Sequence, residues 1–356
     1  MTLPIRQGVA LAPLTTLQVG GAARYLVEVG DADGVRAALD WAAERDLPVE
    51  IIGGGSNVLV ADRGIEGLVL RVRAMGRERD GGRVRVGAGE AWDPFARWTA
   101  EAGLAGVECL VGIPGDVGAA PMQNVGAYGQ EVSQTIAAVE VVDRRDGSVV
   151  TLSPEQCQFG YRDSVFKHEA AGRYVVTAVT FALEEGGAPT VAYGELKRHF
   201  EVVPSDLRAV RDAVIMLRRR KSMVLDPDDD NGRSAGSFFV NPTIARGALP
   251  DVEARAEKAA PGETMPRFDA PDDRLKIPAA WLIERSGLSK GTRRGRVGLS
   301  TKHCLAIVNR GGATAADIVA FAAEVRDRVR DIFGVTLTPE PRTLGFSPDE
   351  LRRLRD

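Results

Sequence analysis

A long glycine-rich segment, Gly112–Gly129, constrains the fold of this chain more than any other part of the sequence. It contains five glycines and two prolines, and Asp116 is its single charged residue. A surface loop is normally more polar than this. Residues without a Cβ let the backbone approach a large flat ligand closely, and Pro114 and Pro121 restrict the loop's freedom. The segment therefore predicts a fold that is built around a bound planar ligand.

A shorter glycine cluster, Gly53-Gly54-Gly55-Ser56-Asn57, directly follows a predicted strand. Backbone N–H groups of consecutive glycines converge on an anion, and Ser56 and Asn57 add side-chain donors, so a phosphate cradle is chemically reasonable. A glycine cluster after a strand is also an ordinary tight turn, and the cluster alone does not decide between these interpretations. The chain lacks a GxGxxG dinucleotide fingerprint and a GxxxxGK[ST] motif, which disfavours a Rossmann site and excludes a P-loop ATPase.

Hydrophobic periodicity organises the chain into a small α/β unit, a second unit of the α+β type and a third, C-terminal unit. We expect an α+β protein with domains over 1–75, 76–215 and 216–356. The polar stretch 245–276 breaks the pattern and is predicted to be a loop-containing excursion. The predicted strands are 24–29, 49–52, 67–72, 84–88, 137–142, 148–152, 174–183 and 305–309, and the predicted helices are 31–45, 94–102, 207–221, 279–286 and 314–333.

Composition excludes several classes of protein. The 46 basic and 49 acidic residues leave a formal net charge of −3, so no global field recruits nucleic acid or an anionic membrane. No apolar run approaches the ~20 residues of a membrane helix, and the N-terminus has no signal-peptide pattern. The three cysteines and three histidines are widely spaced, which gives no disulfide framework and no metal-binding pattern. We expect a cytoplasmic protein without a metal, a nucleic-acid partner or a membrane-inserted segment.

Two further motifs, Phe159-Gly-Tyr-Arg-Asp-Ser164 and Ala235-Gly-Ser-Phe-Phe-Val-Asn-Pro242, lie between the glycine loops and a final Pro339-Glu-Pro-Arg342. In this order the motifs resemble the UDP-N-acetylenolpyruvoylglucosamine reductase (MurB) family over nearly the whole chain. The resemblance implies an FAD-binding fold of the vanillyl-alcohol-oxidase (PCMH) type in two α/β subdomains, followed by a C-terminal α+β substrate-binding domain. It also implies noncovalent FAD, NADPH as co-substrate and a small UDP-sugar substrate, and we expect a monomer.

The reaction that the resemblance implies places negative charge on the substrate. Hydride passes from NADPH to the flavin and then to the methylene carbon of an enolpyruvyl ether, which leaves an enolate-like centre that needs stabilisation and a proton. The resemblance assigns the proton to Ser237. It assigns the substrate carboxylate to the guanidinium of Arg162, which offers bidentate hydrogen bonds, and polarisation of the same region to Glu340.

The binding residues follow from the same resemblance. Pyrophosphate is expected on the first glycine cluster and the flavin against the second. The implied cofactor contacts are Gly53, Gly54, Gly55, Ser56, Asn57, Gly115, Gly118, Ala119, Gln123, Asn124, Gly126 and Ala127. The implied substrate contacts are Tyr193 on a closing loop, Lys221 on the diphosphate, Asn241, and His303 with Lys302 as the alternative to it.

Other functions fit parts of the sequence. Gly232-Arg-Ser-Ala-Gly236 satisfies GxSxG and would make Ser234 the nucleophile of a serine hydrolase, but such a nucleophile needs a buried strand before it and a helix after it. The polar run Asp226–Asn231 before the motif disfavours that context. The same FAD fold also serves alcohol and lactone oxidases, many of which tether flavin to a histidine or cysteine, and no histidine lies near the first cluster. A catalytically idle flavin-binding protein would have no need of the three catalytic residues together.

Overall fold

The structure is a computed structural model that describes residues 3–355. The chain forms two compact units. The first comprises the chain up to Val9, Ala23–Gly55 and Ile65–Leu225, and the second comprises Ala10–Ala22, Ser56–Gly64 and the chain from Asp226 onward. The chain therefore passes from one unit to the other inside the first glycine cluster. The three-domain division at residues 75 and 215 stays a prediction.

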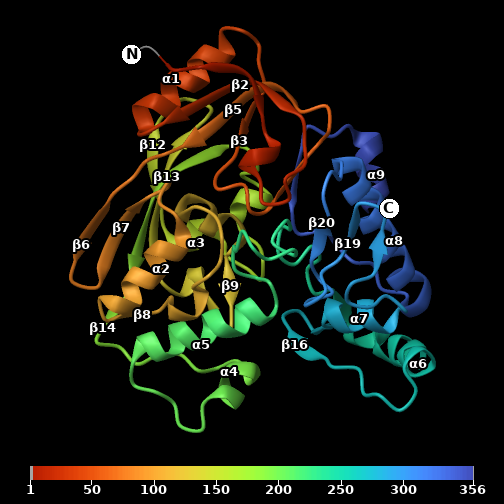
Figure 1. Cartoon of the computed structure of the whole chain (residues 1–356). Helices are drawn as coiled ribbons and strands as arrows, with labels where there is room; N and C mark the ends of the chain where they lie inside the picture. The colour runs from red at the N-terminus through yellow and green to blue at the C-terminus, as the bar shows by residue number, and fades with distance from the viewer. Residues whose placement is uncertain (1–2, 356) are drawn as a thin grey trace. The chain divides into compact units, whose positions relative to one another are not determined.

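One sheet of the first unit has the strand order β1-β2-β5-β3. Its strands are β1 (Arg6–Ala10), β2 (Ala22–Val29), β3 (Val49–Ile51) and β5 (Ile65–Val72), and β5 runs parallel to both β2 and β3. Helix α1 (Ala32–Ala43) begins at Asp31, whose Oδ1 accepts a hydrogen bond from the Gly34 N–H at 2.7 Å. The helix lies beside this sheet (Figure 1) and contacts β5. The strands and the helix predicted over 24–72 are confirmed, and the structure adds the short strand β4 (Val58–Val60) where a loop was expected.

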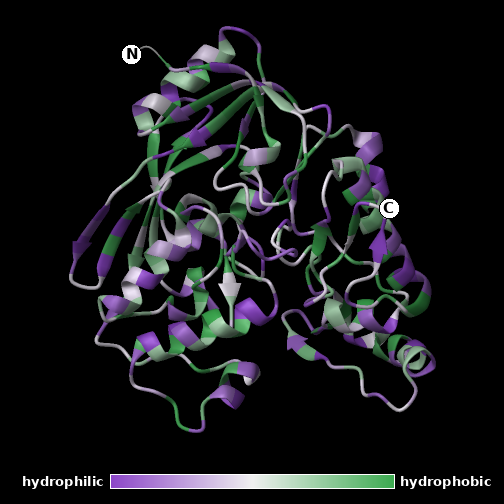
Figure 2. Ribbon diagram, viewed as in Figure 1, coloured by the Kyte–Doolittle hydropathy of each residue, from purple (hydrophilic) through white to green (hydrophobic). Residues whose placement is uncertain are grey.

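The second sheet of this unit is antiparallel, in the order β12-β11-β13-β7-β6. Most residues of its central strands β11 and β13 are buried, whereas every residue of the edge strand β6 is exposed and hydrophilic (Figure 2). Charged residues on an edge strand oppose pairing with another chain. The strands are β6 (Arg77–Asp80), β7 (Arg83–Gly87), β11 (Ile136–Asp143), β12 (Val149–Leu152) and β13 (Tyr174–Ala182).

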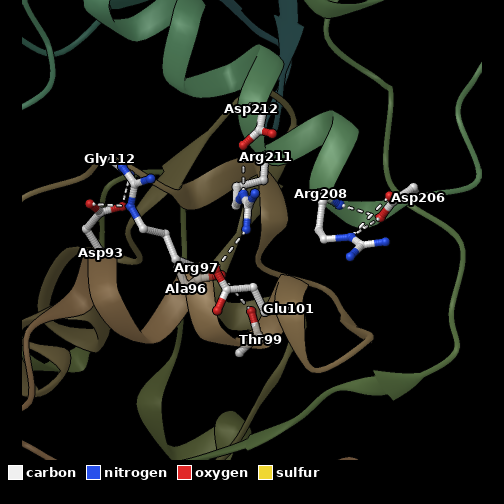
Figure 3. A network of polar contacts seen from close by, with 10 residues as sticks. All are labelled: Asp93, Ala96, Arg97, Thr99, Glu101, Gly112, Asp206, Arg208, Arg211 and Asp212. Atoms are coloured by element: carbon white, nitrogen blue, oxygen red, sulfur yellow. Dashed lines mark hydrogen bonds and ion pairs between the residues drawn. The ribbon is translucent and has the colours of Figure 1, made fainter.

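Helices α2 (Trp92–Glu101) and α5 (Leu207–Arg220) pack together in this unit and place the start of the long glycine-rich segment. Between the helices, Arg211 of α5 donates to the Glu101 carboxylate of α2 at 3.1 Å (Figure 3). At the other end of α2, the Asp93 carboxylate accepts from the backbone N–H of Gly112. The first residue of the segment is thus tied to a rigid helix.

Short elements organise the remainder of the first unit. Half of the glycine-rich segment lies in the 3-10 helix η3 and the two-residue strand β9, which the hydrophobic pattern does not reveal. These elements are β8 (Leu104–Ala105), η2 (Glu108–Leu110), η3 (Val117–Gln123), β9 (Gly126–Ala127), β10 (Gln130–Glu131), η4 (Val132–Gln134), α3 (Pro154–Cys157), η5 (Val165–Lys167), β14 (Glu184–Glu185) and α4 (Gly194–His199).

The second unit is built on the long helix α8 (Ala315–Phe333), whose buried Ile318, Phe321, Val325 and Val329 confirm the predicted helical stripe. A helix with one apolar stripe packs that stripe on its neighbours. The other helices are η1 (Ala12–Leu14), η6 (Arg246–Ala248), α6 (Leu249–Ala259), α7 (Ala279–Arg285) and α9 (Pro348–Arg355). The strands are β4 (Val58–Val60), β15 (Thr243–Ala245), β16 (Phe268–Ala270), β17 (Arg274–Lys276), β18 (Arg293–Arg294), β19 (Val297–Leu299), β20 (Ile307–Asn309) and β21 (Arg342–Leu344).

The prediction for residues 245–276 is incomplete. Besides loops, the segment contains the helix α6 and most of a small antiparallel sheet of order β15-β17-β16. Its buried residues are sparse and stand among charged neighbours; they are Val252, Ala256, Ala260, Met265 and Leu275. So dilute an apolar pattern does not identify a helix from sequence alone.

The N-terminus of α8 supplies the first testable prediction. Thr314 and Asp317 form a capping box, and the Asp62 carboxylate accepts from the N–H groups of Ala315 at 2.7 Å and Ala316 at 2.9 Å. Asp62 thus occupies two donors that the first helical turn otherwise leaves unpaired. We expect Asp62→Ala to lower the free energy of unfolding by about 1 kcal/mol, measured by urea denaturation. Asp62→Asn keeps one acceptor and should lose less; equal losses for the two variants would contradict the capping role.

Candidate functional site

The two predicted glycine loops lie against each other in the first unit. A Cβ on Gly54 would lie 2.8 Å from the Cα of Gly115 and 3.0 Å from Oδ1 of Asp116, so a side chain at Gly54 does not fit. A Cβ on Gly53 would lie 3.6 Å from Oδ2 of Asp116, which is ordinary contact. Gly55 has a φ of +67°, in the left-handed region. The structure thus brings Gly54 to Gly115 and Gly53 to Asp116, as a shared cradle requires.

The second loop is held against the turn between β7 and α2. The N–H of Gly118 donates to the Ala88 carbonyl at 2.9 Å, and a Cβ on Gly118 would lie 2.6 Å from the Cβ of Ala88. The N–H of Trp92 donates to the Gly115 carbonyl at 2.9 Å. Ala119 lies one residue further on in η3, and its N–H donates to the carbonyl of Asp116 at 3.0 Å. Backbone contacts on several sides fix the shape of this loop.

Asn124 has a structural task in the loop. It adopts a φ of +44°, is 1% exposed, and donates through Nδ2 to Glu131 at 2.8 Å and to the Gly160 carbonyl at 2.9 Å. Its Oδ1 accepts from the N–H of Ser133 at 3.0 Å. Gln123 ends η3 immediately before it, and Gly126 and Ala127 follow in β9. The Asn124 side chain is thus hydrogen-bonded to three groups of the protein itself. Its expected contact with the cofactor stays a prediction.

Arg162 reaches the same loop from its own motif. It adopts a φ of +54°, a costly conformation for a residue with a Cβ. Its guanidinium donates to the carbonyls of Asn124 and Gly126, and it lies 5.5 Å from the ring centre of Tyr161. The structure therefore brings Arg162 to the second glycine loop, and its carboxylate-binding role stays a prediction.

Tyr193 and Lys221, two predicted substrate residues, belong to one cluster. Lys221, at the C-cap of α5, forms an ion pair with Glu195 of α4, and its ammonium lies 5.7 Å from the ring centre of Tyr128. The Tyr128 and Tyr193 rings meet edge to face at 5.5 Å. Tyr193 is the N-cap residue of α4 and is half exposed. The structure thus places Tyr193 and Lys221 in one cluster through Tyr128 and Glu195, and their contacts with the substrate stay predictions.

Tyr128 and Glu195 are members of this cluster that the sequence did not single out. Two sequence features could have identified them: Tyr128 is an aromatic residue inside a loop of small residues, and Glu195 follows the predicted Tyr193 by two positions. Burial raises the pKa of Tyr128 to about 12, against the effect of the nearby Arg218. Arg218 donates to the carbonyls of Gly112 and Met223, and burial lowers its pKa to about 10.

Ser237 and Glu340 belong to neighbouring segments of the second unit. The chain after Ser237 runs beside the segment 338–340: the N–H of Glu340 donates to the Phe238 carbonyl at 2.8 Å, and Phe239 bridges to Pro339. Phe238 and Phe239 are buried, Ser237 is half-buried, and Gly236 has a φ of +70°. The left-handed glycine and the two anchored rings fix the backbone on both sides of the Ser237 hydroxyl.

The other predicted residues of the second unit have local partners. Asn241 accepts through Oδ1 from the N–H of Ala279 at 2.9 Å, at the start of α7. The N–H of His303 donates to the Ser300 hydroxyl at 3.2 Å, and Lys302 pairs with Asp229 at 3.0 Å. Ser56 and Asn57 begin the segment that leads into β4, which pairs with β21 directly after the Glu340 motif.

The hydrolase alternative does not fit the local geometry. Ser234 is 7% exposed, and its hydroxyl accepts from the N–H of Gly236 at 3.4 Å. The first helical element after it is the short η6, beyond the strand β15, so the helix of a nucleophile elbow is missing there. Among residues 3–355, no group of three or more acidic, histidine or cysteine side chains is arranged to hold a metal ion.

Comparison with known proteins extends these observations. Residues 23–153 match the model of an FAD-binding domain, and residues 226–344 match the C-terminal domain of UDP-N-acetylenolpyruvoylglucosamine reductase. Relatives of that name from Streptomyces avermitilis and Thermobifida fusca are each 46% identical, over 94% and 98% of this chain and 93% and 100% of their own. The crystal structure of the reductase (MurB) from Thermus caldophilus covers 96% of this chain and all of its own, with a TM-score of 0.66 and 29% identity.

The fold and its two glycine loops define an FAD-binding protein of the α+β class. The chain belongs to the UDP-N-acetylenolpyruvoylglucosamine reductase family. The family resemblance and the expected fold class are therefore confirmed. In the part of the chain that the structure describes, no helix has the length and apolar character needed to span a bilayer.

The residues of the first unit fit a flavin nucleotide. The close approach of Gly54 to Gly115 leaves a cradle that a Cβ would fill, as a large ligand bound by backbone requires. Asp116, beside that contact, has a buried carboxylate oxygen without a hydrogen-bond partner among residues 3–355. A buried polar atom of this kind indicates a partner that is absent from the protein itself.

Proposed function

We propose that this protein reduces the enolpyruvyl group of UDP-N-acetylglucosamine enolpyruvate to UDP-N-acetylmuramate, with bound FAD and with NADPH as the reductant. Family membership supports the reaction class. The structural observation that carries the proposal is the placement of Ser237 beside the Glu340 segment, because such a reduction needs a proton donor and a polarising group together. We propose noncovalent FAD on the two glycine loops, a monomer, a cytoplasmic location and the division into domains 1–75, 76–215 and 216–356.

A bound flavin supplies the hydride relay that the reduction of a carbon–carbon double bond by NADPH requires. Residues of this chain then stabilise the negative charge that forms on the substrate. We propose that Arg162 binds the substrate carboxylate, into which the charge of the enolate-like centre is delocalised. The guanidinium would then donate to the substrate carboxylate as well as to the carbonyls of Asn124 and Gly126, which it contacts already.

We propose that the Ser237 hydroxyl donates the proton that completes the reduction. A serine is a weak acid, so this role depends on placement, which the left-handed Gly236 and the buried Phe238 and Phe239 restrict. Glu340 would polarise the same region from the neighbouring segment. Positioned proton transfer of this kind contributes ~10²–10⁴ in rate.

We propose that Tyr193, Lys221, Asn241 and His303 contact the UDP-sugar. Lys221 is the clearest of the four, because an ammonium is a point donor for phosphate oxygens. In the structure this ammonium is already paired with the Glu195 carboxylate. A substrate diphosphate would therefore compete with Glu195 for Lys221.

If the diphosphate and Glu195 compete for Lys221, substitutions of Lys221 and of Glu195 should change KM for the UDP-sugar in opposite directions. We expect Lys221→Ala to raise KM for the UDP-sugar about ten-fold or more, because a charge-assisted bond is lost. Glu195→Gln removes the competing carboxylate from a partly exposed pair, so KM should fall about two- to five-fold. Steady-state kinetics at fixed NADPH measures both values. A rise in KM for Glu195→Gln would contradict the competition.

The proposed function is tested by product analysis. Purified protein should be yellow and, without oxygen, should oxidise more than one equivalent of NADPH per bound FAD only when UDP-N-acetylglucosamine enolpyruvate is added. The product should be heavier than the substrate by two hydrogens, as mass spectrometry can measure. A colourless protein to which FAD does not bind, or NADPH oxidation without that product, would overturn the proposal.

A further inference from the structure

Asp116 belongs to the second glycine loop, its carboxylate lies against Gly53 and Gly54 of the first, and none of the roles given above uses it. Its Oδ1 lies 3.0 Å from the Cβ position of Gly54, and its Oδ2 lies 3.6 Å from that of Gly53. The residue is 8% exposed. Its backbone is fixed, because Ala91 bridges to Asp116 and the Ala119 N–H donates to its carbonyl. The side chain is therefore a rigid part of the cradle.

The Asp116 carboxylate is incompletely paired. Its Oδ2 is buried without a hydrogen-bond partner in the described part of the chain, and the nearest cationic atom, Nη1 of Arg73, is 3.8 Å away. Burial raises the pKa of Asp116, and Arg73 and Arg71 oppose that rise only in part. A buried acceptor that lacks a donor costs free energy, which a ligand with a donor would recover.

We propose that Asp116 is a further cofactor-binding residue, whose Oδ2 accepts a hydrogen bond from a sugar-chain hydroxyl of the bound flavin nucleotide. A hydroxyl satisfies the unpaired oxygen, whereas a phosphate oxygen would place a second negative charge beside it and raise the cost. Acidic side chains accept from nucleotide hydroxyls in other dinucleotide sites for the same reason. The inference rests on the FAD part of the proposed function and is independent of the substrate.

A comparison of FAD, FMN and lumiflavin shows which part of the cofactor contacts Asp116. The ribityl chain is common to FAD and FMN, the adenosine ribose belongs to FAD alone, and lumiflavin has neither. Titration of full-length apoprotein, followed by quenching of flavin fluorescence, gives the dissociation constant of each. We expect Asp116→Ala to weaken FAD binding about 10- to 100-fold and to leave lumiflavin binding unchanged. An equal loss for FMN assigns the ribityl chain, and a loss for FAD alone assigns the ribose.

Two variants keep the experiment decisive. Asp116→Asn preserves size and one acceptor oxygen, so we expect a smaller loss of FAD affinity with the thermal stability of the apoprotein retained. Tighter FAD binding by either variant would show that the carboxylate faces phosphate, and would overturn the proposal. Unchanged FAD affinity in a folded Asp116→Asn or Asp116→Ala protein would overturn it as well. Neither result would remove flavin binding itself, so the proposed function would stand.

The pH dependence of FAD binding tests the acceptor role of Asp116 independently. A proton on the carboxylate competes with the cofactor hydroxyl, so affinity should fall as the pH falls through the raised pKa of Asp116. Arg73 and Arg71 are the charged groups that act on this carboxylate. The expected decrease begins above the usual range of an aspartate and is absent in Asp116→Asn. A wild-type affinity that rises with falling pH, or that matches the variant throughout, contradicts the acceptor role.

Discussion

Ser237→Ala protein is expected to accept hydride from NADPH at close to the wild-type rate, while its reoxidation by the enolpyruvyl substrate slows about 10²-fold or more. The two half-reactions separate because only the second creates a centre that must be protonated. Gly236 and the buried Phe238 and Phe239 should hold the backbone in place without the hydroxyl. Stopped-flow absorbance of the flavin measures the two rates independently.

The control for this prediction is Ser234→Ala, three residues earlier. Ser234 is the nucleophile that a hydrolase would use, and its hydroxyl accepts a long hydrogen bond from the N–H of Gly236 at 3.4 Å. We expect both half-reactions of this variant to stay within about three-fold of wild type, since one neutral hydrogen bond is worth little. Equal slowing of both half-reactions in Ser237→Ala would refute the proton-donor role.

Gly54→Ala should weaken FAD binding about 10- to 100-fold. The added Cβ would lie 2.8 Å from the Cα of Gly115 and 3.0 Å from the Asp116 carboxylate, and neither a backbone atom nor a buried side chain moves away freely. Relieving such overpacking costs about 1–3 kcal/mol, and here it does so by separating the two loops that form the cradle. Flavin titration of the apoprotein measures the loss.

A matched control for Gly54→Ala is Gly30→Ala. Both substitutions add one methyl group in the first unit, but a Cβ on Gly30 would meet nothing within 4 Å. We expect Gly30→Ala to bind FAD as wild type does. Unaltered FAD affinity in Gly54→Ala would mean that the loops can separate without affecting the cofactor, and that the cradle is elsewhere.

The periodic part of the fold was predictable from the sequence. Helices α1, α5 and α8 begin and end close to the predicted residues because each has an apolar stripe and a polar cap or charged end. The segment 245–276 was not predictable in the same way, since its few apolar residues are spread among charged ones. Strands as short as β4 and β21 exist through their pairing with each other, which no local pattern records.

The candidate site was predictable in its residue types and less so in its contacts. The glycine loops and the motifs around Arg162 and Ser237 are visible as local sequence. Contacts between distant residues are not: Asp62 caps a helix 253 positions away, and Glu195 pairs with Lys221 only because α4 packs near the end of α5. Asp116 was visible as the single charge of its loop. Only the structure shows that its Oδ2 is buried without a hydrogen-bond partner among the described residues.

The central claim is that this protein passes hydride to an enolpyruvyl UDP-sugar, and anaerobic reoxidation tests it most directly. Wild-type protein is reduced with one equivalent of NADPH without oxygen and then mixed with UDP-N-acetylglucosamine enolpyruvate. We expect the oxidised flavin spectrum to return within the time of one turnover, with formation of one equivalent of UDP-N-acetylmuramate. A protein that stays reduced with this substrate and is reoxidised only when oxygen is admitted would contradict the account.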